Sequence, residues 1–130
     1  MRPGSKQYLA SELGGGKVTL ITTTEKWDEK LTEAKNKGQL VVVNFSAAWS
    51  TPCRFIATAY RNLADKHDSL MFLTVDVDQL PEFSTSWNIK ATPTFFFLIN
   101  GQPIDSFVGA DEKELAKKIE AAAAGFIQVQ

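Results

Sequence analysis

The chain has 130 residues, 44% of them hydrophobic and 22% charged, which is the size and composition of one globular domain with its own core. Its net charge is −1, and no basic run alternates with aromatic residues, so a nucleic-acid partner is not expected. No apolar stretch approaches the ~18 residues of a membrane span. The single cysteine excludes a disulfide within one molecule, and we expect a monomer in the cytoplasm, where thiols stay reduced.

Glycine residues divide the start of the chain from the part that is expected to fold. Residues 1–16 are predicted to be a flexible lead, of which residues 1–5 resemble a cloning scar. Gly14-Gly15-Gly16 ends this lead. We therefore expect one domain over residues 17–124 and a short tail over 125–130.

The first half of that domain alternates strand and helix signals. Val18–Ile21 has the β-branched content of a strand. Thr22 and Glu25 have the spacing of a capping box, which predicts a helix that ends at Gly38. The apolar run over residues 40–45 predicts a central strand that is covered on both faces.

The second half continues the alternation and closes with a hairpin. A helix is predicted over 51–66, a strand over 70–75 and a short helical turn over 81–86. Residues 94–99 are a strand, and Asn100-Gly101 predicts a tight turn into a return strand over 104–108 and then a last helix that begins near Asp111. The order β-α-β-α-β-α-β-β-α predicts an α/β fold with a mixed central β-sheet flanked by helices.

The segment Trp49-Ser50-Thr51-Pro52-Cys53-Arg54 lies where the central strand is followed by a helix. The carboxyl ends of strands are the usual place for chemistry in such sheets, and a helix N-terminus stabilises a thiolate. Cys53 could therefore be an acidic, reactive thiol. It could equally be a small buried hydrophobic residue, because unpaired cysteines are usually buried.

Four segments in order resemble the thioredoxin family, plant h-type branch, over about residues 17–124. They are Phe45–Ala57, Val75–Asp78, Ala91–Phe95 and Val108–Ala110. That family reads Trp-Cys-Gly-Pro-Cys-Lys/Arg where this chain reads Trp-Ser-Thr-Pro-Cys-Arg. The resemblance implies the thioredoxin fold and the protein-disulfide reductase activity of a thiol–disulfide oxidoreductase.

By the same resemblance, Ser50 occupies the position of the nucleophilic cysteine and Cys53 is the resolving cysteine. Oxygen cannot take part in disulfide exchange, so we expect this monothiol form to lack turnover. Two origins of Ser50 stay open: an engineered Cys→Ser replacement, which we favour because the swap is nearly isosteric, and a natural variant.

The family also implies a substrate-docking surface and a proton-transfer position. A cis peptide bond is expected before Pro93. The expected docking residues are Trp49, Pro52, Thr92, Pro93, Gly109 and Ala110. Asn44 stands where many thioredoxins carry a buried aspartate that transfers a proton, and Thr74 where its lysine partner often lies. Because asparagine cannot titrate, that role is in doubt for Asn44.

The resemblance implies protein disulfides as substrates, and either thioredoxin reductase or glutathione with glutaredoxin as the electron donor. His67, the only histidine, lies in a polar segment, so we expect no metal site, and no cofactor. Two rival functions remain. One is a non-enzymatic peptide-binding adaptor or holdase, and the other is monothiol exchange at Cys53 that gives a glutathione adduct or a covalent dimer.

Overall fold

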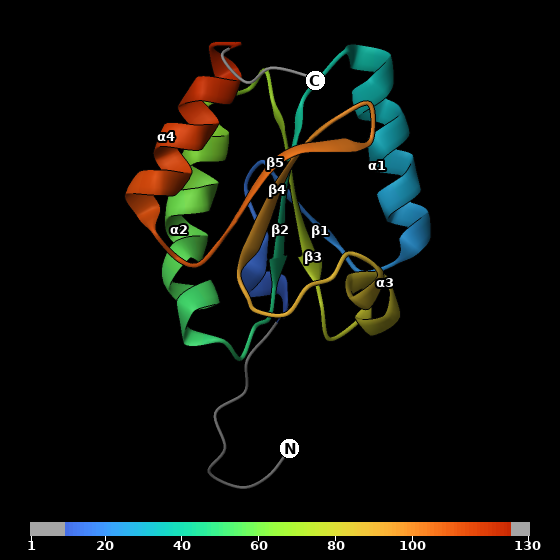
Figure 1. The fold of residues 1–130 in the computed structure, drawn as a ribbon, viewed down its shortest axis with the longest axis vertical. Coiled ribbons are helices and arrows are strands. Elements are labelled where there is room, and N and C mark those ends of the chain that lie inside the picture. The colour runs from blue at the N-terminus through green and yellow to red at the C-terminus, as the bar shows by residue number, and fades with distance from the viewer. Residues whose placement is uncertain (1–9, 126–130) are drawn as a thin grey trace, which may run out of the picture.

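The computed structural model describes residues 10–125, which form a five-stranded sheet with helices on both faces (Figure 1). The elements in chain order are η1 (Ala10–Leu13), β1 (Val18–Ile21), α1 (Thr24–Lys37), β2 (Val41–Ser46), α2 (Thr51–Lys66), β3 (Met71–Asp76), α3 (Pro81–Ser86), β4 (Thr94–Ile99), β5 (Gln102–Val108) and α4 (Glu112–Ala123). The predicted order from β1 to α4 is confirmed.

The sheet has the strand order β1-β3-β2-β4-β5, with β2 and β3 in its interior. β1, β3 and β2 are parallel, whereas β4 pairs antiparallel with β2 and β5 pairs antiparallel with β4, so the mixed sheet that the sequence predicts is confirmed. Figure 1 shows α2 and α4 on one face of the sheet and α1 and α3 on the other. The carboxyl ends of the parallel strands meet at the end where α2 begins.

Two local details differ from the expectation. The capping residue of α1 is Thr23, whose side chain accepts a hydrogen bond from the Lys26 backbone N–H, and not Thr22. Three consecutive threonines offer the same hydroxyl in three registers, and sequence spacing does not choose among them. The return strand β5 begins at Gln102, earlier than predicted, directly after a turn in which Asn100 has φ 50° and Gly101 φ 78°.

Each face of the sheet buries its own apolar core. On one face, Tyr60 of α2 packs with Phe72 and Phe95, and its hydroxyl donates to the Leu73 carbonyl oxygen at 2.7 Å. Burial raises the pKa of Tyr60 well above its ordinary value. On the other face, Trp27 of α1 packs against Phe45 of β2. The sheet is thus covered on both sides, as its continuous apolar strands require.

The short helix η1 is the one element that the sequence analysis did not predict. It comes before the three glycines, in the segment expected to be a flexible lead. Leu13 at its end is only 2% exposed and packs onto the domain. Some of the chain before residue 17 therefore contributes to the folded core.

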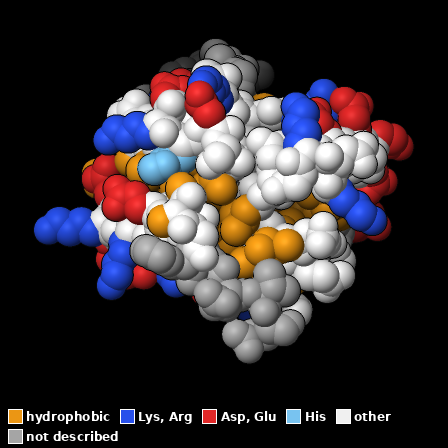
Figure 2. All heavy atoms as spheres, turned by 90° about the horizontal axis from the view of Figure 1, so that it is seen from above, with side chains coloured by type: hydrophobic (Ala, Val, Ile, Leu, Met, Phe, Trp, Pro, Cys, Tyr) orange, Lys and Arg blue, Asp and Glu red, His pale blue; other side chains and the backbone are white. Residues whose placement is uncertain are grey.

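The end of the sheet opposite the start of α2 is seen in Figure 2, where apolar side chains surface among charged ones. A groove of about 330 Å³ lies at this end, lined in part by Leu40, Ile99 and Ala122.

No helix within residues 10–125 is long and apolar enough to cross a bilayer.

Candidate active site

Ser50 is the residue on which α2 begins. β2 ends at Ser46, a short turn follows, and the backbone N–H of Ser50 donates to the Ala47 carbonyl oxygen at 3.1 Å. The Ser50 hydroxyl accepts from the Cys53 backbone N–H at 3.4 Å, which makes it the N-cap of α2. Its side chain is 5% exposed. A serine at this position therefore has a structural role as well as a place in the candidate site.

Cys53 lies in the first turn of α2 and has no exposed surface. Its sulfur accepts a weak hydrogen bond from the Ala47 backbone N–H at 3.4 Å. Cys53 forms a small apolar cluster with Leu13 of η1 and Ala48, and Leu20, which is partly buried, packs against this cluster. The thiol is therefore deeper than the Ser50 hydroxyl and is enclosed by residues from three different segments.

Arg54 supports the turn that carries these residues. Its guanidinium donates to the Ala48 carbonyl oxygen at 3.1 Å and to the Thr51 hydroxyl at 3.3 Å. The cation therefore bonds to the backbone before Trp49 and to the side chain that follows Ser50.

The predicted docking residues lie at this same end of the sheet. Trp49 is 59% exposed, Pro52 is exposed and Pro93 is buried. The Thr92–Pro93 bond is cis, as expected from the resemblance. The Gly109 N–H donates to the Pro93 carbonyl oxygen at 2.9 Å, so these two segments are held side by side.

A groove of about 490 Å³ joins part of this set to α3. Trp49, Ser50 and Thr92 all line it, whereas four predicted docking residues do not: Pro52, Pro93, Gly109 and Ala110. Ala110 packs instead against the core between α2 and the sheet. The other residues that line the groove are Val77, Pro81, Ser84, Thr85, Ile89, Lys90 and Ala91.

β2 and β3 carry buried polar side chains in the half of each strand that leads to its carboxyl end. Asn44 and Thr74 are register partners on β2 and β3, and both are almost fully buried. Among the described residues, the Asn44 Oδ1, Ser46 Oγ and Thr74 Oγ1 atoms have no hydrogen-bond partner. An unpaired buried polar atom costs free energy, so this region gives up stability.

Asp76, the register partner of Ser46, is the charged member of this polar region. Burial raises the pKa of its carboxyl above the ordinary value, and the neighbouring Asp78 carboxylate raises it further. Hydrogen bonds from the backbone N–H groups of Asp78 and Gln79 lower the pKa and partly offset these effects.

Within residues 10–125, no group of three or more His, Cys, Asp or Glu side chains is arranged to hold a metal ion.

Sequence reasoning missed two residues that bear on Cys53. Leu13 covers the thiol, and Arg61 of α2 donates to the Glu12 and Gly14 carbonyl oxygens beside it. The only sequence signal for Leu13 was an apolar residue directly before three glycines. No sequence signal pointed to Arg61.

Comparisons with known proteins agree with this geometry. A family model described as Thioredoxin matches residues 18–121. Thioredoxin H9 of Arabidopsis thaliana is 59% identical over 108 residues, which cover 83% of this chain and 77% of that protein. A thioredoxin H-type of Populus jackii is 58% identical over 110 residues, which cover 85% and 79%.

A similar solved structure is that of the poplar thioredoxin h mutant PtTrxh4C61S, with a TM-score of 0.84 and 56% identity over 86% of this chain and 87% of that one. The mixed sheet with helices on both faces is therefore the thioredoxin fold. The chain belongs to the thioredoxin family, in its plant h-type branch.

Proposed function

We propose that this chain is a monothiol form of a protein-disulfide reductase that docks disulfide partners without turning them over. One observation carries the proposal: Ser50 caps α2 three residues before the only cysteine of the chain, with its hydroxyl 3.4 Å from the Cys53 backbone N–H. A sulfur at position 50 would lie at the helix N-terminus, where a thiolate is stabilised.

With a cysteine at position 50, the chemistry that we propose for this site has two steps. A thiolate at position 50 attacks a substrate disulfide, forms a mixed disulfide and releases one substrate sulfur as a thiolate. The Cys53 thiolate then attacks the sulfur at position 50, which releases the second substrate sulfur and leaves an internal disulfide. Because Ser50 has no sulfur, the first step cannot take place here.

The proposed docking surface comprises Trp49, Pro52, Thr92, Pro93, Gly109 and Ala110. The exposure of Trp49 and the groove that it shares with Thr92 support this assignment. An extended substrate segment would pair with the Thr92 backbone, as in strand addition.

The substrates that we propose are protein disulfides. For a form with a cysteine at position 50, the electron donor that we propose is either thioredoxin reductase or glutathione with glutaredoxin. We propose a monomer in the cytoplasm, a reducing compartment that would keep Cys53 a free thiol. We favour replacement of a cysteine as the origin of Ser50, because serine is nearly isosteric with cysteine and the chain keeps Trp49, Pro52 and Cys53 of the motif.

Reduction of insulin disulfides with dithiothreitol as donor tests the function. The Ser50→Cys variant should reduce insulin rapidly, and the parent chain should stay at the uncatalysed rate. An inert Ser50→Cys variant would contradict the proposal, since it would mean that surroundings such as Asn44 and Thr74 no longer support exchange.

The alternative function is a non-enzymatic adaptor or holdase, which the exposed Trp49 and its groove would serve without any thiol. Binding of a fluorescent, cysteine-free extended peptide separates the two. An adaptor should bind such a peptide equally well with Ser50 or Cys at position 50, and should show no gain of turnover in the Ser50→Cys variant.

A further inference from the structure

Cys53 does not belong to either of the two large apolar cores. It forms a separate small cluster with Leu13 and Ala48, against which Leu20 packs. Ala48 comes from the turn before α2, whereas Leu13 comes from η1, on the other side of the three glycines. One wall around the only thiol of the chain is therefore supplied by a segment outside the sheet and its four α-helices.

Polar contacts from α2 hold η1 and the residue after it in place. The Arg61 guanidinium donates through Nη1 to the Glu12 carbonyl oxygen at 3.0 Å and to the Gly14 carbonyl oxygen at 3.3 Å. Through Nη2 it donates to the Thr58 hydroxyl at 3.1 Å, which fixes its direction. A single side chain of α2 thus ties the backbone at the end of η1 to the helix that carries Cys53.

The connection between η1 and β1 has the properties of a hinge. Gly15 has φ 110° and Gly16 has φ 57°, conformations that glycine adopts without the cost that other residues incur. The backbone of Gly15 exchanges hydrogen bonds with Val18 at 3.2 and 3.0 Å, so the sheet side of the hinge is anchored. Beyond it, η1 is only four residues long, and a short element of this kind opens more easily than the whole domain unfolds.

We propose that η1 is a removable cover on the Cys53 thiol, latched by Arg61, and that Cys53 reacts when η1 lifts while the rest of the domain stays folded. In this cover, Leu13 packs over the sulfur, and Arg61 holds η1 in position. The inference rests on the proposed function only where it treats Cys53 as the resolving thiol. The accessibility of the sulfur itself does not depend on turnover.

Alkylation by iodoacetamide tests this directly, because the chain has one thiol. The Cys53 thiolate forms a bond to the carbon of the reagent, the carbon–iodine bond breaks and iodide leaves. Leu13→Ala should raise the alkylation rate at least about tenfold under native conditions, since the shield loses most of its side chain. Arg61→Gln should raise it less, because only the latch is weakened.

Leu31→Ala is the matched control. Leu31 is a partly buried leucine of α1 on the other face of the sheet, so the change lowers global stability without touching η1. In the Leu13→Ala variant the rate should depend only weakly on low concentrations of urea, because local opening exposes little surface. Global unfolding would make the rate rise steeply with urea.

Three results would overturn the inference: an alkylation rate in Leu13→Ala equal to that of the parent, an increase no larger than that in Leu31→Ala at matched stability, or a urea dependence as steep as that of global unfolding. Insulin reduction by the Ser50→Cys variant is measured separately. A failure of the cover would therefore leave the proposed oxidoreductase function standing, and the reverse also holds.

Discussion

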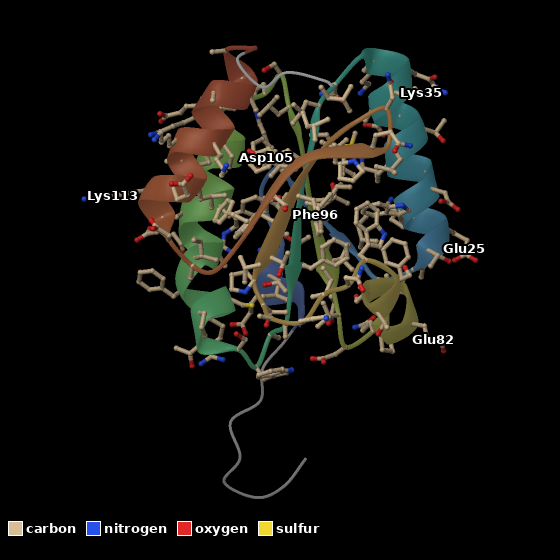
Figure 3. All side chains as sticks on the ribbon, in the orientation of Figure 1. Glu25, Lys35, Glu82, Phe96, Asp105 and Lys113 are labelled. Atoms are coloured by element: carbon tan, nitrogen blue, oxygen red, sulfur yellow. The ribbon has the colours of Figure 1, made fainter. Side chains whose placement is uncertain are left out.

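The two faces of the sheet differ most at the level of the candidate site. On the α1 and α3 face, five aromatic side chains pack against one another, with ring centroids as close as 5.0 Å for Trp27 and Phe83 and 5.1 Å for Trp87 and Phe96. Phe96, labelled in Figure 3, extends from β4 into this layer. On the α2 face, the same strands present Asn44, Ser46, Thr74 and Asp76.

The difference indicates that packing at this level stabilises the fold more on the aromatic face than on the polar face. Aromatic rings on one face bury large apolar areas and contact one another favourably. The polar face leaves oxygen atoms unpaired among the described residues and buries a carboxyl group. The second face is the one on which Cys53 lies, so the less stable packing coincides with the proposed chemistry.

Phe45→Ala should produce the largest loss of stability, because it removes a ring at the centre of the aromatic layer. We expect the free energy of unfolding in urea to fall by about 3–5 kcal/mol, the usual cost of such a truncation. Phe55→Ala is the control: Phe55 is 60% exposed, and its loss should change stability by less than about 0.5 kcal/mol. Equal effects of the two changes would contradict the assignment of stability to this face.

Ser50→Ala should have the next largest effect, since it removes the cap of α2 and leaves both faces of the sheet intact. The expected loss of stability is about 0.5–2 kcal/mol. Asp111→Ala, which removes the corresponding cap of α4, gives a comparison within the same chain. If Ser50→Ala costs nothing while Asp111→Ala does, the hydroxyl of Ser50 does not cap α2.

Thr74→Val should stabilise the protein, which is the opposite of the usual effect of a core substitution. The change removes a buried hydroxyl that has no partner among the described residues, and we expect a gain of about 1 kcal/mol in urea unfolding. Thr94→Val should destabilise, because the Thr94 hydroxyl donates to the Ala91 carbonyl oxygen. Loss of stability in both variants would show that Thr74 is satisfied.

Asp76→Asn should give the smallest effect, and its sign depends on pH. The pKa of Asp76 in the folded protein lies above its ordinary value of 3.8. At pH values between 3.8 and the raised pKa, the folded state therefore binds more protons than the unfolded state. Stability should therefore fall as pH rises through the interval and stay lower above it. Asparagine keeps the oxygen that accepts from the Asp78 N–H, so the variant should be more stable than the parent at pH 7 and lack this decline.

For Asp76, the unfolding free energy measured from pH 3 to pH 7 in parent and variant is the test. A parent whose stability rises over this interval relative to Asp76→Asn would mean that the carboxylate is stabilised by the fold. Asp78→Asn should reproduce part of the gain, because the Asp78 carboxylate is one cause of the raised pKa.

Sequence patterns predicted much of this fold because each element has a local cause. The spans 51–66, 81–86 and 94–99 agree with α2, α3 and β4, which carry proline starts or dense β-branched and aromatic runs. The helix η1 has no such signal, since four residues cannot show a helical period. Which threonine caps α1 depended on a choice among three equivalent hydroxyls.

The candidate site was only partly accessible to sequence reasoning. Motif order brought Trp49, Ser50 and Thr92 to one end of the sheet, and the structure joins them in one groove. The cover of Cys53 by Leu13 and the latch at Arg61 depend on a fold-back over three glycines, which no local pattern reports. The raised pKa of Asp76 likewise follows from burial, which depends on how the strand packs in the fold.

The central claim is that position 50 is the place of attack and Cys53 the place of resolution. Trapping of insulin as a mixed disulfide, seen by non-reducing electrophoresis and mass spectrometry, tests it most directly. The Ser50→Cys, Cys53→Ser double variant should accumulate a stable adduct, because its introduced thiol can attack and nothing can release the product. The parent chain, whose only thiol is the covered Cys53, should form almost none. Equal trapping by the parent would show that Cys53 is itself the attacking thiol and would contradict the account.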